Sequence, residues 1–266
     1  MIAEIYNKIS SSGSNLTDRL EDKLTGDFFG ALRYLPYECG LKPILEAVRF
    51  HNEADRAEWL RTLDGLEAYA VDYVFWPNHD EGEIDLLLKH TDAYIGVEVK
   101  YRSSLSSVDE DTGELAPSIT PENSKNQLAR YARMLADVAG TRDKYLVFLA
   151  PYDILFPVEA GIRENPVIVS SVKVGFLGWQ DAQAALFRID RSILPHWQTL
   201  IITDLIDLLQ KKRLTRYAGL PESLIHTELS NDVYRFTMSK AYGGAGYSWA
   251  VNQVIGDDVY VYGRTE

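Results

Sequence analysis

The segment that most constrains the fold is residues 82–101, GEIDLLLKHTDAYIGVEVKY, in which two short apolar runs flank the polar residues 90–92. Runs of this length, bounded by turn residues, predict two β-strands joined as a hairpin. Three charged residues, Asp85, Glu98 and Lys100, stand in or beside these strands, where a sheet normally buries apolar side chains. These charges need an explanation that packing alone does not give.

Composition bounds the class of protein. The chain has 266 residues, of which 46% are apolar and 25% charged, as in a globular protein with one large domain or a core and an added lobe. No apolar run approaches the length of a membrane-spanning helix, and the first residues lack the basic start and apolar core of a signal peptide. We therefore expect a cytoplasmic protein with no membrane partner. The single cysteine, Cys39, excludes a disulfide or a cysteine zinc cluster within one chain.

The net charge of −12 argues against direct binding of nucleic acid, which usually requires a basic face. The longest basic run is Lys211-Lys212-Arg213, at the end of an expected amphipathic helix, where cations also favour the negative end of the helix dipole. The triplet is therefore as consistent with a helix cap as with contact to DNA. If the chain binds nucleic acid, either folding creates a positive surface or a partner supplies it.

The order of apolar patterns along the chain predicts an α/β fold with a mixed sheet. Expected helices cover residues 16–35, one or two segments within 43–64, Thr120 to about Ala139, 182–189 and 195–214. Expected strands cover residues 68–76, two runs within 82–101, 144–152, 171–177, 233–238 and 257–263. Thr120 is the expected N-cap of its helix and Pro121 the first helical residue. Between the strands and this helix, residues 103–118 form an acidic loop.

We divide the chain into a core, residues 1–155, and a C-terminal extension, residues 156–266, packed on the core as one domain. The long helix of the extension is expected to bury one face, formed by Trp197, Ile201, Leu205 and Leu208. A hairpin is expected at the C-terminal end. The GGAG sequence at residues 243–246 is expected to be a turn, since it lacks the Lys-Ser/Thr that follows a phosphate-binding loop.

The three charges of the hairpin suggest a chemical role. Successive side chains on a strand alternate between faces, so Glu98 and Lys100 share one face while Val99 points to the other. A hairpin of this length brings Asp85 close to Glu98, and two neighbouring carboxylates raise one pKa unless a cation lies between them. Such oxygen ligands suit Mg²⁺ or Mn²⁺, with the Val99 carbonyl as an additional ligand. Lys100 would orient a water molecule or stabilise charge on a phosphate.

Asp85 followed by Glu98-Val99-Lys100 resembles the PD-(D/E)XK nuclease superfamily, whose members hydrolyse phosphodiesters with Mg²⁺ on a mixed sheet flanked by helices. The first motif here reads Glu83-Ile84-Asp85 where that pattern has Pro-Asp. The resemblance implies a restriction-endonuclease-like core with C-terminal helical and β-hairpin additions.

Two further features extend this resemblance over residues 21–131. Gln127 and Tyr131 resemble the Gln-x-x-x-Tyr motif of RecB-like members, and four-residue spacing places them on one helical face. The resemblance implies that Gln127 holds a water or phosphate, whereas Tyr131 stacks on a base or packs against the sheet. Glu21, at the margin of the first helix's apolar stripe, matches a helical glutamate that reaches the metal in the family. As an ordinary acid near a helix N-terminus, it has an equally simple explanation.

The function that the resemblance implies is metal-dependent cleavage of nucleic acid, with DNA expected ahead of RNA. Asp85 and Glu98 would hold one or two Mg²⁺ or Mn²⁺ ions with help from Glu21. A metal-bound water would attack the phosphate in line, with Lys100 positioning that water and Gln127 steadying the site. A restriction, repair or phage-defence system is the expected setting, with a protein partner or homodimer as a further possibility.

Two other classes of protein remain open. One is a catalytically silent protein of the same fold that serves binding or assembly, which suits the acidic balance of the chain. The other is a non-nuclease α/β binding protein in which Asp85, Glu98 and Lys100 form an ordinary salt-bridge network. If these three side chains lie within reach of one metal ion, the site can be catalytic; if they do not, the silent protein is favoured.

Overall fold

The computed structural model describes residues 16–66, 71–103, 105, 107 and 119–216, together with the backbone of residues 251–255 and 259–262. The chain divides into two compact units, Met1–Arg216 and Tyr217–Glu266, which are described separately. The first unit holds every residue singled out above as a candidate for the functional site.

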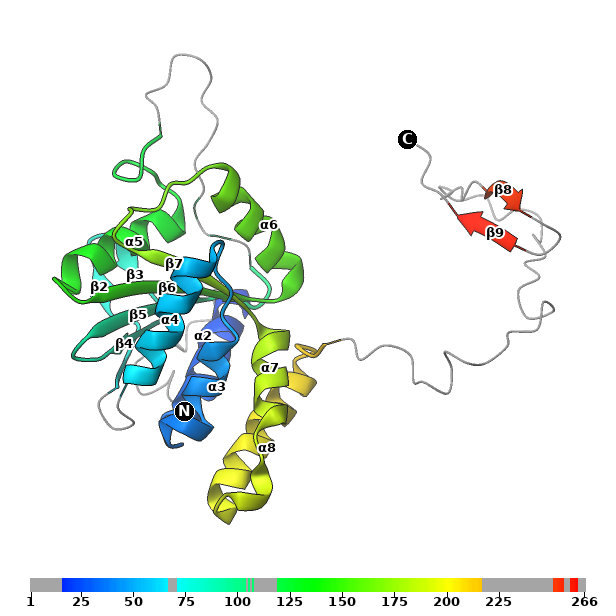
Figure 1. The fold of residues 1–266 in the computed structure, drawn as a ribbon, viewed down its shortest axis with the longest axis horizontal. Helices are drawn as coiled ribbons and strands as arrows, with labels where there is room; N and C mark the ends of the chain where they lie inside the picture. The colour runs from blue at the N-terminus through cyan, green and yellow to red at the C-terminus, as the bar shows by residue number, and fades with distance from the viewer. Residues whose placement is uncertain are drawn as a thin grey trace. The chain divides into compact units, whose positions relative to one another are not determined.

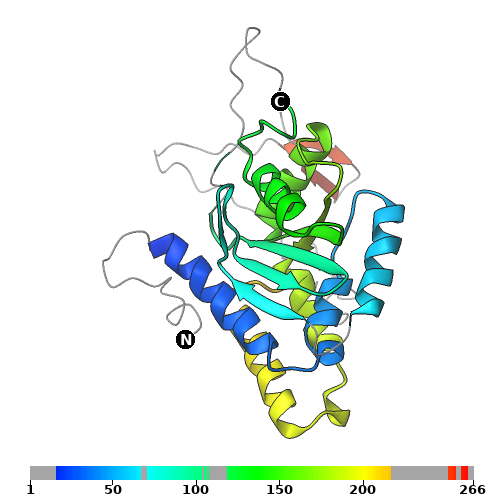
Figure 2. The ribbon, with the colours of Figure 1, turned by 90° about the vertical axis from the view of Figure 1, so that its left-hand side faces the viewer.

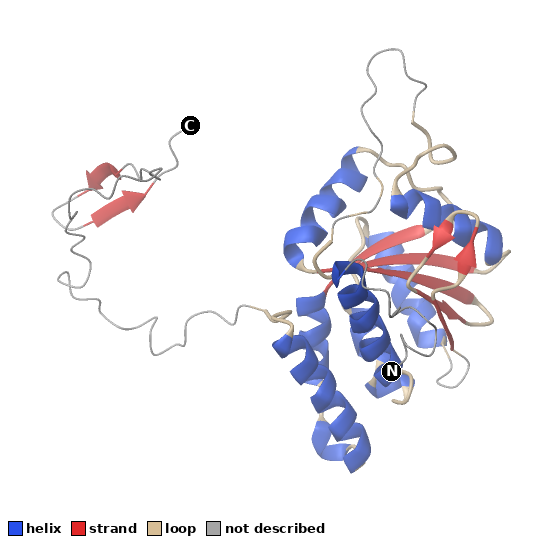
Figure 3. Cartoon of the chain, turned by 180° about the vertical axis from the view of Figure 1, so that it is seen from behind, coloured by secondary structure: helices blue, strands red, loops and turns tan. Residues whose placement is uncertain are grey.

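The first unit is built on a mixed five-stranded sheet in the order β1-β4-β5-β6-β7 (Figures 1 and 3). Its strands are β1 (Asp72–Phe75), β4 (Leu86–Lys89), β5 (Ala93–Val99), β6 (Asp143–Ala150) and β7 (Lys173–Gly178). β1, β4 and β5 pair antiparallel, whereas β5, β6 and β7 pair parallel, so the carboxyl ends of the last three meet at one edge. A separate two-stranded ribbon joins β2 (Asn78–His79) to β3 (Gly82–Glu83).

Helices cover both faces of the sheet, as Figures 1 and 2 show. One face carries α5 (Gln127–Val138) and α6 (Tyr152–Glu164). The opposite face carries α2 (Leu16–Leu32), α3 (Leu41–Glu46), α4 (Glu53–Gly65), α7 (Trp179–Arg188) and α8 (His196–Lys211). Short 3₁₀ turns, η1 (Tyr37–Cys39) and η2 (Arg191–Ile193), complete the described elements. The arrangement is a three-layer α/β/α unit, which confirms the α/β class and the mixed sheet expected from the sequence.

The alternation along β5 explains how its two faces differ. Ile95, Val97 and Val99 are buried in the apolar core beneath α2, α7 and α8, with Trp59 and Trp179 among its largest fully buried side chains. Glu98 is directed to the other face, beneath α5. A period of two therefore gives one strand an apolar face and a face that carries charge.

Most of the predicted elements of the first unit are present. The stripe of the first helix is buried as expected, although α2 ends at Leu32. Residues 43–64 correspond to two helices, α3 and α4. The hairpin of residues 82–101 forms β3, β4 and β5, and His90 N–H bonds to the Ala93 carbonyl across its turn.

The start of α5 was predicted wrongly. The helix begins at Gln127, where the Asn126 side chain accepts a hydrogen bond from Leu128 N–H, and Thr120 is not its N-cap. Thr120 N–H instead bonds to the Asn123 side chain, and Asn123 N–H returns to the Thr120 carbonyl, which closes a turn. Asparagine side chains stabilise turns and caps alike, and here that local bonding outweighs the Thr-Pro start signal.

The buried face of α8 also differs from the prediction. Leu205 is buried and Ile201 and Leu208 pack partly buried against the core, but Trp197 is 50% exposed, and the most buried side of the helix is formed by Ile202, Leu205, Ile206 and Leu209. The packing partners of α8, which are α2 and α7, select this face.

The sheet continues beyond residue 155, where the sequence suggested a boundary. β7 pairs with β6 in parallel, and the helix that joins them, α6, which contains Pro157, was not predicted. The compact unit ends at Arg216. In the second unit, β8 (Val251–Ile255) and β9 (Val259–Tyr262) form a hairpin, in which β9 lies within the expected strand 257–263 and β8 was not predicted. The strand expected at 233–238 and the turn at 243–246 lie outside the described residues.

Two glycines provide a test of how tightly β7 packs. A Cβ on Gly175 would overlap Val48 Cγ1 and lie 2.9 Å from Phe50 Cζ, whereas a Cβ on Gly161 in α6 would meet nothing within 4 Å. Gly175→Ala is therefore expected to lower the free energy of unfolding in urea by about 1–3 kcal/mol. Gly161→Ala should raise it by about 0.5–1 kcal/mol, since alanine favours a helix. Equal effects of the two variants would contradict this packing.

Candidate functional site

Two acids meet at the end of the β4–β5 pair. Asp85 immediately precedes β4, and the register Leu86 opposite Val97 places it across from Glu98. Asp85 Oδ2 accepts a hydrogen bond of 2.8 Å from the backbone N–H of Val99. Both acids are at least nine-tenths buried. The sheet therefore holds two carboxylates next to each other away from water, as the hairpin length predicted.

Lys100 joins these strands to α2. Its Nζ lies 2.7 Å from Glu98 Oε1 and 3.2 Å from Glu21 Oε1. The other oxygen of Glu21, Oε2, accepts hydrogen bonds from Tyr101 N–H at 2.8 Å and from Ser103 Oγ at 2.7 Å. Glu21 thus ties the N-terminal half of α2 to the end of β5, over 79 residues of sequence.

Gln127 and Tyr131 approach Glu98 from α5. Gln127 Nε2 donates to Glu98 Oε1 at 2.8 Å and to the Tyr131 hydroxyl at 3.1 Å. The Tyr131 hydroxyl donates in turn to the Glu83 carbonyl at 2.7 Å. Tyr131 is 6% exposed within the core beneath α5, so it packs against the sheet and is not placed to stack on a base. Gln127 touches a carboxylate directly and therefore orients it.

Three contributors to the site were not anticipated from the sequence. They are the backbone of Tyr101, the hydroxyl of Ser103, and the Trp179 indole N–H, which donates to the Lys100 carbonyl at 2.9 Å. Trp179 lies on α7, 79 residues from Lys100, and no local pattern connects them. Of the three, only Ser103 could have been suspected from the sequence, because it is a polar residue shortly after the charged strand.

Burial and mutual repulsion set the protonation of the acids. Burial raises the pKa of Asp85 to about 7, although the Lys100 ammonium and the Val99 N–H oppose this rise. Burial and the neighbouring Asp85 raise the pKa of Glu98 well above its usual range. For Lys100, burial favours the neutral amine, but Glu98 and Glu21 outweigh burial and raise its pKa. Lys100 is therefore a cation at neutral pH.

The donor set fits a hard divalent cation at Asp85 and Glu98. Within the described residues, no group of three or more His, Cys, Asp or Glu side chains is arranged to hold a metal ion. Mg²⁺ usually binds through one or two carboxylates and keeps several waters, so two acids suffice. Glu21 reaches the site, but both of its oxygens are engaged by Lys100, Tyr101 and Ser103. At Val99 the contact shown is made by N–H, and the role of its carbonyl as a ligand stays a prediction.

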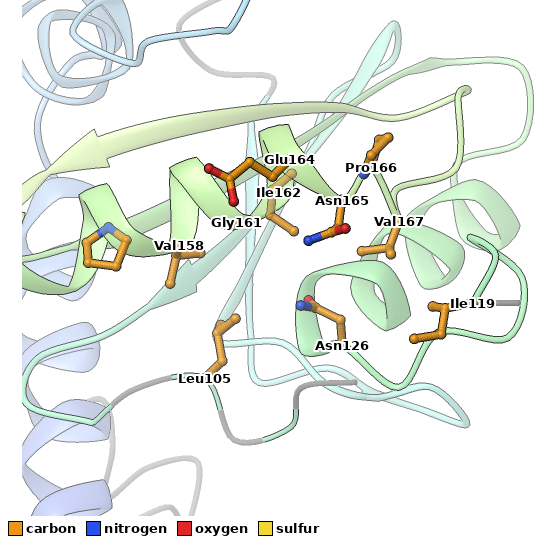
Figure 4. A pocket seen from close by; sticks show the side chains of 11 residues that line it. Leu105, Ile119, Asn126, Val158, Gly161, Ile162, Glu164, Asn165, Pro166 and Val167 are labelled. Atoms are coloured by element: carbon orange, nitrogen blue, oxygen red, sulfur yellow. The ribbon is translucent and has the colours of Figure 1, made fainter. Parts of the chain in front are cut away.

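A separate pocket of about 910 Å³ opens between the C-terminal half of α6 and the start of α5 (Figure 4). Its wall includes Val158, Ile162 and Val167 from one side and Asn126 and Ile119 from the other. None of the predicted site residues lines it. The concave feature of Figure 4 is therefore not the place where the charged residues converge.

No protein-family model, curated protein or solved structure matches this chain. In the described residues, no helix combines the length and apolarity required to cross a bilayer.

Asp85→Asn tests how much the buried, ionised Asp85 carboxylate destabilises the folded protein. Because the folded pKa of Asp85 is raised, its contribution to stability is present at low pH and is lost as pH rises from about 4 to 7. Asparagine retains an acceptor for Val99 N–H without the charge. In metal-free buffer, Asp85→Asn should therefore raise the melting temperature by several degrees at pH 8, with a smaller effect at pH 4. Thermal unfolding across this pH range measures both.

The matched control is Asp207→Asn, which neutralises an exposed acid on α8. Its effect at pH 8 should be much smaller than that of Asp85→Asn, because the Asp207 side chain is already in water. If Asp85→Asn were less stable than the wild type at pH 8, the ionised Asp85 carboxylate would not be destabilising as inferred here.

Proposed function

We propose that the protein is a divalent-metal-dependent phosphodiesterase that cleaves nucleic acid, with DNA as the substrate. The observation that carries this proposal is the pairing of Glu98 and Glu21 with Lys100, with Asp85 held across from Glu98 at the carboxyl edge of the sheet. The five-stranded mixed sheet flanked by helices supports the resemblance to the PD-(D/E)XK superfamily.

The charge balance favours this reading over an ordinary salt-bridge network. A structural network compensates its charges, because each unpaired buried ion costs several kcal/mol. Here Glu98 and Glu21 pair with one ammonium, the charge of Asp85 also acts on it, and repulsion from Asp85 contributes to the raised pKa of Glu98. A divalent cation beside Asp85 and Glu98 would balance the excess negative charge.

Asp85 and Glu98 are the residues that would hold the ion. When bound there, a divalent ion acts as a Lewis acid that polarises the phosphate and makes a neighbouring water more acidic. Asp85 is fixed by Val99 N–H, and Glu98 is fixed by Gln127, so both carboxylates are oriented before substrate arrives. Preorganised ligands of this kind need little rearrangement during the reaction.

Lys100 supplies a positive charge and a hydrogen-bond donor. Its raised pKa keeps it protonated, so it stabilises negative charge and does not act as a base. An ammonium has three N–H donors, of which two are directed to Glu98 and Glu21. The third is available to orient a water molecule or a phosphate oxygen.

Gln127 and Tyr131 are positioning residues in this proposal. Gln127 holds the Glu98 carboxylate, and Tyr131 holds the Gln127 amide while it anchors to the Glu83 carbonyl. Through this chain of hydrogen bonds, α5 fixes the angle of Glu98 relative to Asp85.

The alternative of a catalytically silent binding subunit would require misplaced side chains, since Asp85, Glu98 and Lys100 are all present. Their observed proximity counts against it. Its chemical signature would be a protein that binds DNA without cleaving it under any metal condition.

The test is cleavage of circular and linear DNA, single- and double-stranded, by purified protein in Mg²⁺ or Mn²⁺. Asp85→Asn and Lys100→Met should each slow cleavage by about 100-fold or more, because a metal ion and a positioned cation each contribute several kcal/mol to such reactions. Removal of the metal with EDTA should abolish cleavage.

Asp207→Asn serves again as the charge-matched control and should cleave at the wild-type rate. Circular dichroism establishes that each variant is folded. Cleavage that persists in EDTA, or that survives in Asp85→Asn, would refute the proposed function.

A further inference from the structure

A basic cluster lies directly beside the candidate site. The ring of Tyr101, the residue after Lys100, has the Arg102 guanidinium at 5.1 Å and Lys212 Nζ also at 5.1 Å from its centroid. Cations at this distance are attracted by the negative faces of an aromatic ring. The Tyr101 ring is itself buried, so it serves to hold the two cations at the end of β5.

The segment after α8 brings further positive charge to the same edge of the sheet. The Tyr101 hydroxyl donates to the Lys212 carbonyl at 3.4 Å, and buried Leu214 anchors the segment through its N–H bond to the Leu209 carbonyl. Arg216 then reaches Tyr152 and Asp181, which follow β6 and β7. Residues 212–216 therefore pass along the carboxyl ends of the three parallel strands.

The backbone of Arg213 is left-handed at the end of α8. Its φ is 60°, in the left-handed region that glycine or asparagine normally occupies after a helix. The arginine side chain is exposed here, and a residue with a Cβ is less favourable than glycine in this conformation. Arg213 follows the C-cap Lys212, and its conformation lets Arg213 N–H bond to the Gln210 carbonyl and Leu214 N–H bond to the Leu209 carbonyl, which closes the end of α8.

Helix capping does not explain these cations fully. Lys211 ends α8 and complements its dipole, but the Lys212 side chain is directed to the Tyr101 ring, and Arg102 belongs to another part of the chain. Within the described residues, neither Arg102 nor Lys212 forms an ion pair with an acid.

We propose that Arg102, Lys212 and Arg213, here called the basic rim, bind the phosphates of a nucleic-acid strand that flank the one at Lys100. The proposal rests on the proposed function and deepens it, because it assigns the surface that holds the substrate. Guanidinium and ammonium groups are the usual partners of backbone phosphates, and they act without regard to sequence. Folding thus creates a local positive surface on a chain whose net charge is −12.

The same strand contains a matched control. Near the start of β5, the Tyr94 ring has Lys89 Nζ at 5.8 Å and the Arg142 guanidinium at 5.1 Å. This arrangement also combines one lysine and one arginine on a tyrosine, but it lies at the opposite end of β5 from Lys100. Removing either pair changes the net charge of the protein by the same amount.

The experiment measures binding of fluorescein-labelled DNA of about 16 nucleotides, single-stranded or duplex, by the full chain in EDTA. Arg102→Ala/Lys212→Ala is expected to weaken binding about tenfold or more, whereas Lys89→Ala/Arg142→Ala should change it by less than about twofold. In a plot of log K for binding against log salt concentration, the slope should become shallower by about 1.4 for single strands or about 1.8 for duplex. This change should occur in the rim variant only. The charge-conserving variant Arg102→Lys/Lys212→Arg should retain most of the affinity.

Arg213→Gly separates binding from folding. Glycine relieves the positive φ, so the melting temperature should rise while affinity for DNA falls severalfold. A rise in melting temperature without loss of affinity for DNA would show that Arg213 does not contribute to phosphate binding. Equal losses in the rim and control pairs, or no binding of either DNA by the wild type, would overturn the proposal.

The two proposals fail in different ways, because binding is measured without metal and cleavage with it. Rim-dependent binding with no cleavage under any metal condition would reject the nuclease and leave the rim intact. Cleavage by the wild type, with equal affinity in the rim and control variants, would reject the rim alone.

Discussion

The constraint on which the rest of the site depends is the burial of two carboxylates, Asp85 and Glu98, which the register of β4 and β5 holds opposite each other. Antiparallel pairing fixes their separation, and burial prevents water from screening them. The neighbouring groups offset part of the cost of burying these charges. Lys100 supplies partial compensation, Val99 N–H stabilises one acid, and Gln127 stabilises the other.

The three layers of the fold contribute to this edge of the sheet from different directions. α5 reaches Glu98 from one face through Gln127, and α2 reaches Lys100 through Glu21. From α7, the Trp179 indole fixes the backbone of Lys100. A charged centre assembled in this way is destabilising by itself, so the large apolar cores on both faces of the sheet must offset it.

The strands, their alternation and the proximity of Asp85 to Glu98 were predictable, because a period of two and a short hairpin are local rules. The pairing of Gln127 with Tyr131 followed from helical geometry for the same reason. The contacts of Glu21 with Tyr101 and Ser103 were not predictable, since no pattern in either segment refers to the other. Thr120 and Trp197 show a different limit: their local signals were real, but neighbouring asparagines and competing packing surfaces outweighed them.

The long sequence separation between Glu21 and Lys100 bears on the order of folding. α5, β5 and β6 are close in the chain and can pair early, whereas α2 must find a partner 79 residues away. Until α2 packs against the sheet, the acids at the end of β5 remain hydrated. The free energy required to remove this water is therefore spent late in folding. Contacts formed after the transition state govern how fast a protein opens more than how fast it folds. The Glu21 linkage is thus a determinant of native-state lifetime.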